Sequence, residues 1–448
     1  MAALPEKITL SGSDFFLRAM DRGGRRQSRL PHVCRMLVLL DGRLEKAALE
    51  ARLREIPEIG WINGSGIKRY FPWQKPFWKS GNASSIPPVA VAESNLPGEG
   101  FAAFLGKIGH ADAYVFPATE SEIPGLRFDI VHHPDSKSTL AMSWHHSIMD
   151  AHGAELLLAA IASDAGEAKI QILPQSTGAR NLRSFSSLAS EVSASRQAIH
   201  HISRFSRMKT ASLQDGGEMN EVHRQENRAV LFSGDDSHQL KENCRQLGLG
   251  FRPSLLFLSA VLRGVHRILQ QRGENPAGYV VPVPQDLRKL GSCGPAFSNQ
   301  VSFYFFRVEA DELDDLPGLT GSLVEQMNEQ TRRRVPEGFS QTMRHFLHLP
   351  LFLYSLFVFG PSKGKLASFS FSYTGQTLRD TPEVMGLTVE DALHIPPAIY
   401  PPGMTAAFMW HRDRLRGTIS SAASLMTPDE AENFERRLRR DLTGMDAS

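Results

Sequence analysis

Residues 138–153 read STLAMSWHHSIMDAHG, a stretch that predicts a β-strand ending at two adjacent histidines, His145 and His146. A short polar turn and a glycine follow, and residues 154–161 then predict a helix because they are strong helix formers. Imidazole is the side chain whose unperturbed pKa lies nearest neutral pH, so a histidine at such a turn suits proton transfer. We interpret His146 as a general base and Asp150 as the residue that holds the turn in shape.

Length and composition restrict the class of protein. The chain has 448 residues, enough for two domains of about 150–200 residues each. Its net charge is only +2, so the overall charge does not indicate a nucleic-acid partner. The three cysteines, Cys34, Cys244 and Cys293, lie far apart, which argues against a disulfide framework and a cysteine zinc site. They fit a reducing compartment, and we expect a cytoplasmic protein.

No apolar stretch reaches the roughly 20 residues of a membrane-spanning helix. The nearest candidate, residues 349–359, is too short and contains Pro350. We expect this run to form core or the wall of a tunnel, with a surface that touches lipid as the alternative. Peripheral contact with a membrane therefore stays open.

Strands and helices alternate along both halves of the chain, which predicts an α/β fold. In the first half, residues 32–40 predict a strand, residues 43–56 a helix, and residues 126–131 a strand that pairs with the central one. The turn between this pair holds His132 and His133, a second histidine pair that we expect to be exposed and inert.

The second half has the same rhythm. Residues 255–270 predict a long apolar helix, and residues 403–410 and 415–422 predict a hairpin. The charged segment 209–228 lacks apolar periodicity and marks our candidate boundary. We predict one domain over residues 1–205 and another over 206–448.

Four interpretations compete for the central stretch. Its histidines and aspartate are metal-ligating types, but their spacing does not match H-E-x-x-H, and we predict no metal site. A serine hydrolase is disfavoured because no G-x-S-x-G elbow is present. The histidines could be purely structural. The interpretation that we favour is acyl transfer, in which histidine removes a proton from a hydroxyl or amine that attacks a thioester.

The run HHSIMD at residues 145–150 resembles the H-H-x-x-x-D motif of a superfamily of acyltransferases. That superfamily includes chloramphenicol acetyltransferase, the plant BAHD acyltransferases, nonribosomal peptide condensation domains and bacterial wax ester synthase/diacylglycerol acyltransferases. Its members usually have glycine directly after the aspartate, whereas this chain has glycine two residues later, at Gly153.

Further segments are similar to the same superfamily. Residues 281–288, VPVPQDLR, resemble its P-V-x-x-R segment, which implies a salt bridge between Arg288 and Asp150. Residues 299–302 resemble the strand that follows, and Asn299 is our candidate there for substrate binding. The strand 370–374 resembles the place where members hold a hydroxyl near the developing oxyanion. We therefore name Ser372 and Thr374 as substrate-binding candidates, with plain strand residues as the alternative.

The resemblance implies an α/β fold of two chloramphenicol-acetyltransferase-like lobes, arranged as a V around a central tunnel. His146 would act there as general base, with His145, Asp150 and Arg288 in the catalytic set. No cofactor would be bound, because acyl-CoA or a phosphopantetheine thioester is the donor substrate, and the acceptor would be a small alcohol or amine. One alternative is a condensation-like enzyme whose basic clusters meet an acyl carrier protein. The other is a catalytically silent member that binds a ligand.

Overall fold

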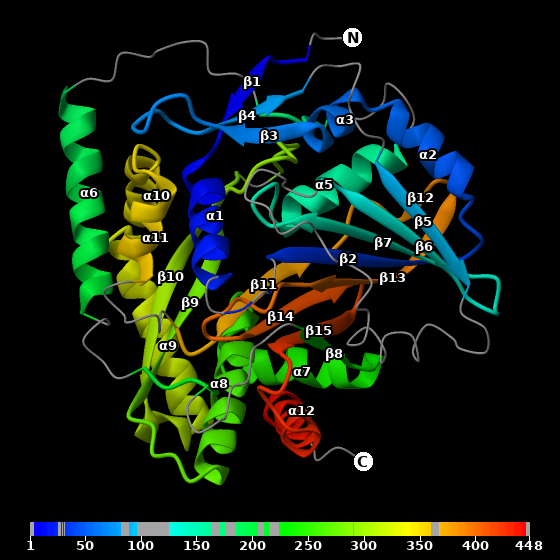
Figure 1. The fold of residues 1–448 in the computed structure, drawn as a ribbon. Helices are drawn as coiled ribbons and strands as arrows, with labels where there is room; N and C mark the ends of the chain where they lie inside the picture. The colour runs from blue at the N-terminus through cyan, green and yellow to red at the C-terminus, as the bar shows by residue number, and fades with distance from the viewer. Residues whose placement is uncertain are drawn as a thin grey trace.

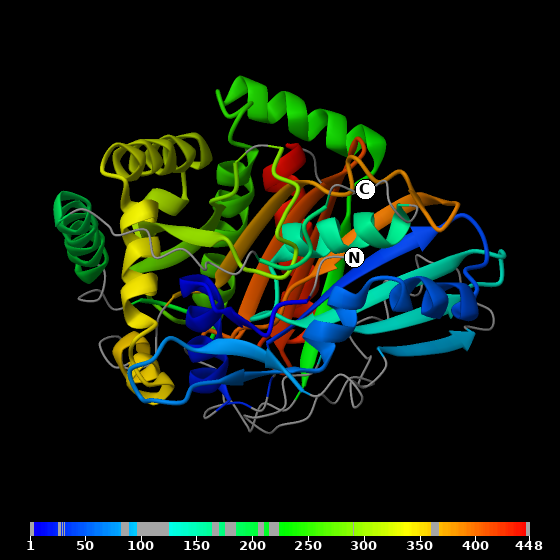
Figure 2. The same ribbon diagram turned by 90° about the horizontal axis from the view of Figure 1, so that it is seen from above.

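The computed structural model has a mixed α/β fold in which strands from both ends of the chain lie side by side (Figure 1). Helices cover the outer faces of the sheets, and α6, α10 and α11 gather on one side of the molecule in both views (Figures 1 and 2). The structure describes residues 4–25, 28, 30, 32–81, 89–95, 125–163, 170–174, 185–204, 210–214, 224–289, 291–359 and 367–444.

The largest sheet within these residues has six strands and contains the central stretch. Neighbouring strands of this sheet are antiparallel, except the two strands at the end of the order given next, which are parallel. The strand order is β12 (Glu383–Val384), β13 (Leu387–Ile395), β2 (Val33–Leu40), β7 (Ser138–His145), β6 (Arg127–His132) and β5 (Ala90–Asn95).

Three smaller sheets complete the strands of the described residues. The four-stranded sheet has the order β11 (Ser370–Gln376), β14 (Met404–His411), β15 (Arg414–Ala422) and β8 (Gln225–Leu231). The two-stranded sheet pairs β10 (Val301–Glu309) with β9 (Gly278–Asp286), and the three-stranded sheet has the order β1 (Lys7–Thr9), β4 (Phe77–Ser80) and β3 (Ser65–Lys68).

The helices begin with α1, which has a capping box, and end with α12, which has both a capping box and proline in its first turn. None of the described helices is both long and apolar enough to cross a bilayer. They are α1 (Gly12–Gly24), α2 (Lys46–Arg54), α3 (Pro57–Asn63), α5 (Ala151–Ala162), α6 (Phe185–Ser203), α7 (Gly234–Gln246), α8 (Pro253–Gln271), α9 (Leu316–Arg332), α10 (Val335–Phe346), α11 (Leu351–Phe359) and α12 (Pro428–Thr443), with a 3₁₀ turn at Ala310–Leu313.

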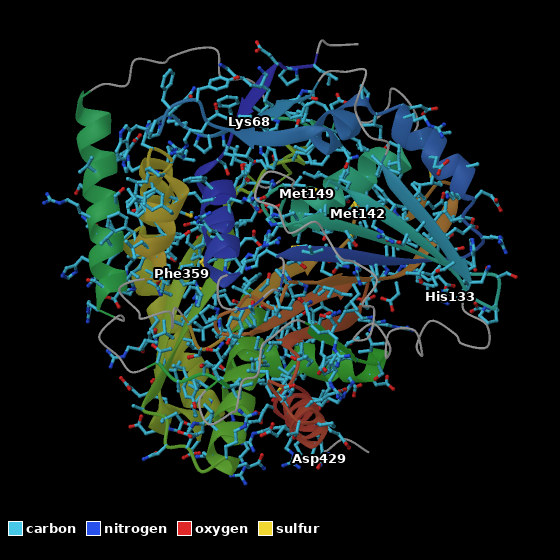
Figure 3. All side chains as sticks on the ribbon, in the orientation of Figure 1. Lys68, His133, Met142, Met149, Phe359 and Asp429 are labelled. Atoms are coloured by element: carbon cyan, nitrogen blue, oxygen red, sulfur yellow. The ribbon has the colours of Figure 1, made fainter. Side chains whose placement is uncertain are left out.

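Two large cores hold these layers together. One surrounds α5 and the strands β2 and β7, where Met142 and Met149 are buried (Figure 3). The other surrounds α8, whose side chains are buried along most of its length. The sheets themselves meet at a small apolar cluster that includes Leu37 of β2 and Met409 of β14.

The predicted elements are largely present. The central strand, the pairing of β6 with β7, the apolar helix α8 and the hairpin of β14 with β15 are confirmed. The helix expected over residues 43–56 is shorter, and a second helix, α3, follows it because Pro57 starts a new one. Our division at residue 205 stays a prediction, although β12 and β13 from the second half extend the first-half sheet.

The expectation for His132 and His133 is wrong, because both side chains are buried. A ring nitrogen of His132 lies 2.6 Å from Glu93 Oε1, and His133 Nε2 lies 2.7 Å from Thr139 Oγ1. The Pro-Asp sequence predicts an exposed turn, and it does not extend to the two histidines before it, whose side chains pack on the sheet. His133 lies at the end of the β6–β7 pair opposite to Met149 (Figure 3), so this pair is far from the central turn.

We expect Arg416 to be a stability determinant, because it joins β15 to β13 through a buried ion pair. Its Nη2 lies 2.9 Å from Asp391 Oδ2, and its Nη1 donates to the carbonyl of Phe232. Arg416→Met leaves the carboxylate of Asp391 unpaired and should lower the free energy of unfolding by about 3–5 kcal/mol in denaturant titrations. Arg436→Met is the control: its ion pair with Glu432 is exposed, so the loss should stay below about 1 kcal/mol. Equal losses in the two variants would contradict this account.

Candidate active site

The central turn connects β7, which ends at His145, to α5, which begins at Ala151. Asp150 is the N-cap of α5: its backbone is extended and its Oδ1 accepts a hydrogen bond of 2.8 Å from the Gly153 amide. The turn is also held to the neighbouring chain, because the His146 amide donates to the His32 carbonyl at 2.8 Å. His146 therefore occupies a backbone position that is fixed from both sides.

The second carboxylate oxygen of Asp150 binds a segment far away in the sequence. Asp150 Oδ2 lies 2.8 Å from Arg288 Nη1 and accepts a hydrogen bond of 2.9 Å from the Gln300 amide. Both side chains of the ion pair are almost completely buried. The structure thus brings together the arginine and the aspartate for which the resemblance implied a salt bridge.

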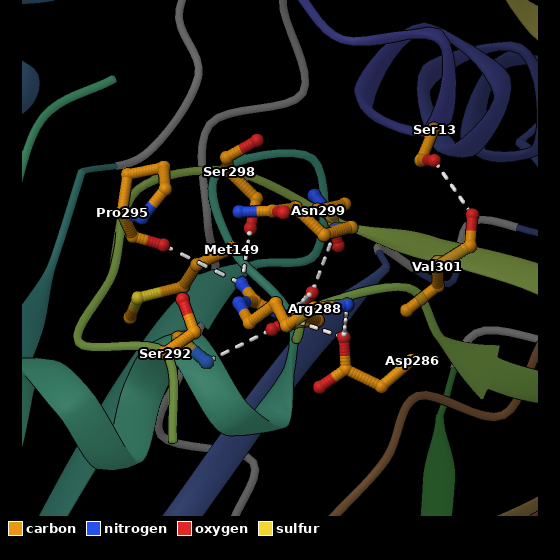
Figure 4. Close-up of polar contacts among 12 residues, drawn as sticks. Ser13, Met149, Asp286, Arg288, Ser292, Pro295, Ser298, Asn299 and Val301 are labelled. Carbon is orange, nitrogen blue, oxygen red and sulfur yellow. Dashed lines mark hydrogen bonds and ion pairs between the residues drawn. The ribbon is translucent and has the colours of Figure 1, made fainter. Parts of the chain in front are cut away.

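Arg288 is enclosed by acceptors on several sides (Figure 4). Its Nη2 donates to the carbonyl oxygens of Ser298 at 3.1 Å and Pro295 at 3.4 Å, and its Nη1 lies 3.3 Å from Asp286 Oδ1. Burial alone would lower the pKa of Arg288, but the neighbouring carboxylate of Asp150 outweighs it and the pKa is raised. The guanidinium is therefore a permanent positive charge that joins the β9–β10 connection to α5.

Asn299 belongs to this framework. Its Nδ2 donates to the His146 carbonyl at 2.9 Å and to Asp14 Oδ1 at 2.9 Å, and its amide donates to the same oxygen at 2.7 Å. Asp14 is the capping-box residue of α1, so the cap of one helix also anchors the central turn. Asn299 is buried and absent from the cavity wall described below, so in this structure it touches the turn.

His145 is completely buried and faces away from the cavity. Its Nδ1 accepts a hydrogen bond of 3.2 Å from the Ser147 amide, which assigns the ring proton to Nε2. That nitrogen lies 3.4 Å from Oδ2 of Asp21 on α1. Burial lowers the pKa of His145, so its ring is neutral near pH 7. The geometry shows His145 as a neutral link between α1 and the turn.

Asp21 is a buried carboxylate that sequence reasoning missed. It binds Arg25 Nε at 2.8 Å and Arg18 Nη1 at 3.1 Å, and it accepts a hydrogen bond of 3.2 Å from the His32 amide. Burial alone would raise the pKa of Asp21, but the hydrogen bond with His145 and the nearby positive charge hold it well below its usual range. Nothing in the sequence connects α1 with the histidine pair, so no signal could have identified it.

A cavity of about 1030 Å³ lies against this framework. Its wall is mostly apolar and includes His146, Asp150 and His152 from the central stretch, together with Ser372 and Thr374 of β11. All five residues from Ser370 to Thr374 line the cavity, and Phe371 also belongs to the apolar core. The hydroxyl of Thr374 is buried and has no hydrogen-bond partner. His145, Arg288 and Asn299 are not part of the wall.

His146 is the histidine of the pair that lines the cavity. Burial lowers its pKa, so the unprotonated form that can accept a proton dominates near pH 7. Another histidine in the wall, His394, is already engaged, because its Nε2 lies 2.9 Å from Glu155 Oε1. No cluster of three or more metal-ligating side chains was found within the described ranges.

Similarity to known proteins is found by comparing structures and not by comparing sequences. No protein-family model matches the sequence, and no curated protein matches it. The fold matches the first condensation domain of the calcium-dependent antibiotic synthetase, crystallised with a substrate analogue, with a TM-score of 0.65, 12% identity, and coverage of 99% of this chain and 97% of that one.

Two further matches widen the comparison. The trichothecene 15-O-acetyltransferase TRI3 from Fusarium sporotrichioides has a TM-score of 0.69, 10% identity, and coverage of 98% and 95%. The starter condensation domain of the rhizomide synthetase RzmA, a mutant in complex with C8-CoA and Leu-SNAC, has a TM-score of 0.63, 13% identity, and coverage of 98% and 94%. The chain therefore has the fold that these condensation domains share with an acetyltransferase, as the H-H-x-x-x-D resemblance implied.

We predict that Asp21→Asn lowers the free energy of unfolding by about 3 kcal/mol at neutral pH, because Arg18 and Arg25 lose a buried charge. The native pKa of Asp21 is depressed, so its contribution is complete above the ordinary aspartate pKa of about 3.9 and is lost as the pH falls further. Denaturant titrations from pH 7 downward should show the variant and the wild type converging in acid. Asp413→Asn, at an exposed ion pair, should change little at any pH. A pH-independent difference would refute the assignment.

Gly153 allows two segments to approach each other closely. A Cβ at this position would lie 2.3 Å from the Ala296 carbonyl oxygen. Gly153→Ala should therefore destabilise the protein by about 1–3 kcal/mol, although alanine is the better helix former. Gly321→Ala in α9 is the matched control, since a Cβ there meets nothing within 4 Å and should stabilise by up to about 1 kcal/mol. Thermal unfolding of both variants tests the contrast, and a stabilised Gly153→Ala would exclude the close contact.

Proposed function

We propose that the protein is an acyltransferase that moves an acyl group from a thioester to a hydroxyl or amine, with His146 as general base. One observation carries the proposal: His146 is the histidine of the motif that lines a large apolar cavity, and its lowered pKa keeps it unprotonated. The fold shared with an acetyltransferase and with condensation domains supports the same reaction class.

In the proposed reaction, His146 accepts the proton of the acceptor O–H or N–H as the oxygen or nitrogen attacks the thioester carbonyl carbon. The tetrahedral intermediate then collapses, the C–S bond breaks, and the proton returns from the imidazolium to the departing thiolate. Ser372 and Thr374 are our candidates for hydrogen bonds to the oxyanion, because both line the cavity and the Thr374 hydroxyl has no other partner.

Asp150 has a positioning role in this proposal. Its two oxygens are occupied by the α5 N-terminus, the Gln300 amide and Arg288, so the carboxylate orients the backbone that carries His146. Asn299 would act in the same way on the His146 carbonyl, and His145 through its contacts with Ser147 and Asp21. Of the predicted site residues, His146 alone would move a proton.

The cavity would be the tunnel between the two lobes that we expect, one over residues 1–205 and the other over 206–448. Its wall takes side chains from both ranges, including Trp144 and Phe303, which supports this arrangement. Donor and acceptor would enter it from different sides, as the superfamily resemblance implies.

We infer that the donor is acyl-CoA or an acyl group on a carrier protein. A comparison of turnover with free acyl-CoA and with carrier-loaded acyl groups would separate the stand-alone transferase from the condensation-like alternative. The displaced glycine favours the remaining alternative, a catalytically silent member that binds a ligand. Saturable ligand binding without consumption of any thioester would support that alternative.

We expect His146→Ala to lower kcat/KM for acyl transfer by a factor of about 10²–10⁴ while the Tm stays unchanged, because the general base is lost. Thiol release from a panel of acyl-CoAs with mixed alcohols and amines is the measurement. In the wild type, kcat/KM should rise with pH and level off below the ordinary histidine pKa of about 6.5, because the pKa of His146 is lowered. His238→Ala on the exposed side of α7 is the control. An undiminished rate in His146→Ala would remove the proposal.

A further inference from the structure

Large apolar side chains are exposed together at one place on the surface. Six of the eleven such side chains among the described residues belong to the loop after β3 and to α11, and each is between 53% and 70% exposed. We call this set the apolar patch; it consists of Tyr70, Phe71, Trp73, Phe352, Leu356 and Phe357.

Hydrogen bonds hold the two parts of the apolar patch side by side. Arg69 donates to the carbonyl oxygens of Leu347 at 3.0 Å and Leu349 at 2.7 Å, just before α11 begins at Leu351. His348 Nδ1 lies 3.1 Å from the Trp73 carbonyl oxygen. The β3–β4 loop and α11 also lie together in both ribbon views, between Lys68 and Phe359 as labelled in Figure 3. The patch is therefore one continuous surface.

The two segments that carry the apolar patch have charges of one sign. Neither residues 59–80 nor residues 338–359 contain an aspartate or glutamate. Exposed basic side chains on these segments are Lys68, Lys75 and Arg344, with Lys79 half-buried beside them. The acidic neighbour that the structure shows is Glu6, 3.8 Å from Lys79 Nζ. Such a surface is complementary to a negatively charged partner.

The apolar patch also reaches the candidate active site. Phe357 is exposed and at the same time lines the cavity, and its neighbour Val358 lines it as well. Ile199 of α6 is likewise both exposed and part of the cavity wall. The cavity therefore has an apolar border on the side where the patch lies.

We propose that the apolar patch docks on an anionic membrane surface. Phe, Tyr and Trp together with lysine and arginine are the side chains that the interface of a bilayer favours. α11 has nine residues, so it would lie in the interface.

Docking would bring the cavity border to the bilayer, and an apolar acyl donor or acceptor would pass directly between them. This last step rests on the proposed acyl transfer, but membrane binding itself does not. The two can fail separately, because vesicle binding needs no substrate and acyl transfer between soluble short-chain substrates needs no vesicle.

The test is co-sedimentation of the full chain with vesicles of phosphatidylcholine and phosphatidylserine, compared with vesicles of phosphatidylcholine alone. We expect tighter binding to the anionic vesicles. The double variant Phe71→Ser/Trp73→Ser should weaken it at least about tenfold. Phe352→Ser/Leu356→Ser should do the same from the other half of the patch. Lys68→Ser and Lys75→Ser should each weaken it about fivefold, and only for anionic vesicles.

Phe251→Ser is the matched control, because Phe251 is fully exposed at the turn between α7 and α8 and is not part of the apolar patch. It should bind vesicles like the wild type, and all variants should keep the wild-type rate with soluble substrates. Absence of wild-type binding, or unchanged binding in both double variants, would overturn the proposal. The proposal would also be overturned if the double variants lost binding to a carrier protein but still bound vesicles.

Discussion

The carboxylate of Asp150 is the contact on which the site depends. One oxygen caps α5, and the other binds Arg288 and the Gln300 amide, so a single side chain joins the end of β7 to the β9–β10 connection. These partners are 3 to 150 residues apart in the sequence. A buried ion pair is costly to break, because the partner that remains stays desolvated without a counter-charge. The direction of the His146 backbone is therefore set by interactions within the folded protein.

A second set of polar contacts joins α1 to the turn that follows β7. Asp21 and Asp14, both on α1, reach the turn through His145 and Asn299. Their pKa values move in opposite directions for physical reasons. The contact with His145, together with the charge of Arg25, keeps Asp21 ionised, whereas burial dominates at Asp14 and raises its pKa. The two adjacent histidines are thereby separated: His145 is enclosed with these groups, and His146 lines the cavity.

The arrangement explains how an apolar cavity can lie beside the polar clasp, by which we mean Asp150, Arg288 and Asn299 with their hydrogen bonds. Asp150 reaches the wall, whereas Arg288 and Asn299 bind their polar partners outside it, so the wall itself can be mainly aliphatic and aromatic. Burial then lowers the pKa of His146, and this effect outweighs the opposite effect of the nearby Asp150 carboxylate. The same wall continues to the outer surface at α11, where the apolar patch begins.

Local sequence determined the elements and the residues that meet in one turn. The strand and helix periods predicted β7, α8 and the last hairpin. The H-H-x-x-x-D resemblance indicated His146 and the Asp150–Arg288 pair. Such signals work because they depend on neighbours within a few residues, or on a motif that the superfamily shares.

Tertiary structure alone decided the rest. Pairing of β13 with β2, the contact of Asp21 with His145, and the burial of His132 and His133 all join side chains whose positions in space no local pattern encodes. The late glycine is a further case: Gly153 is required by the Ala296 carbonyl, which approaches from a segment more than a hundred residues away. The packing of α1 is another case: it encloses His145 through Asp21, while His146 lines the cavity.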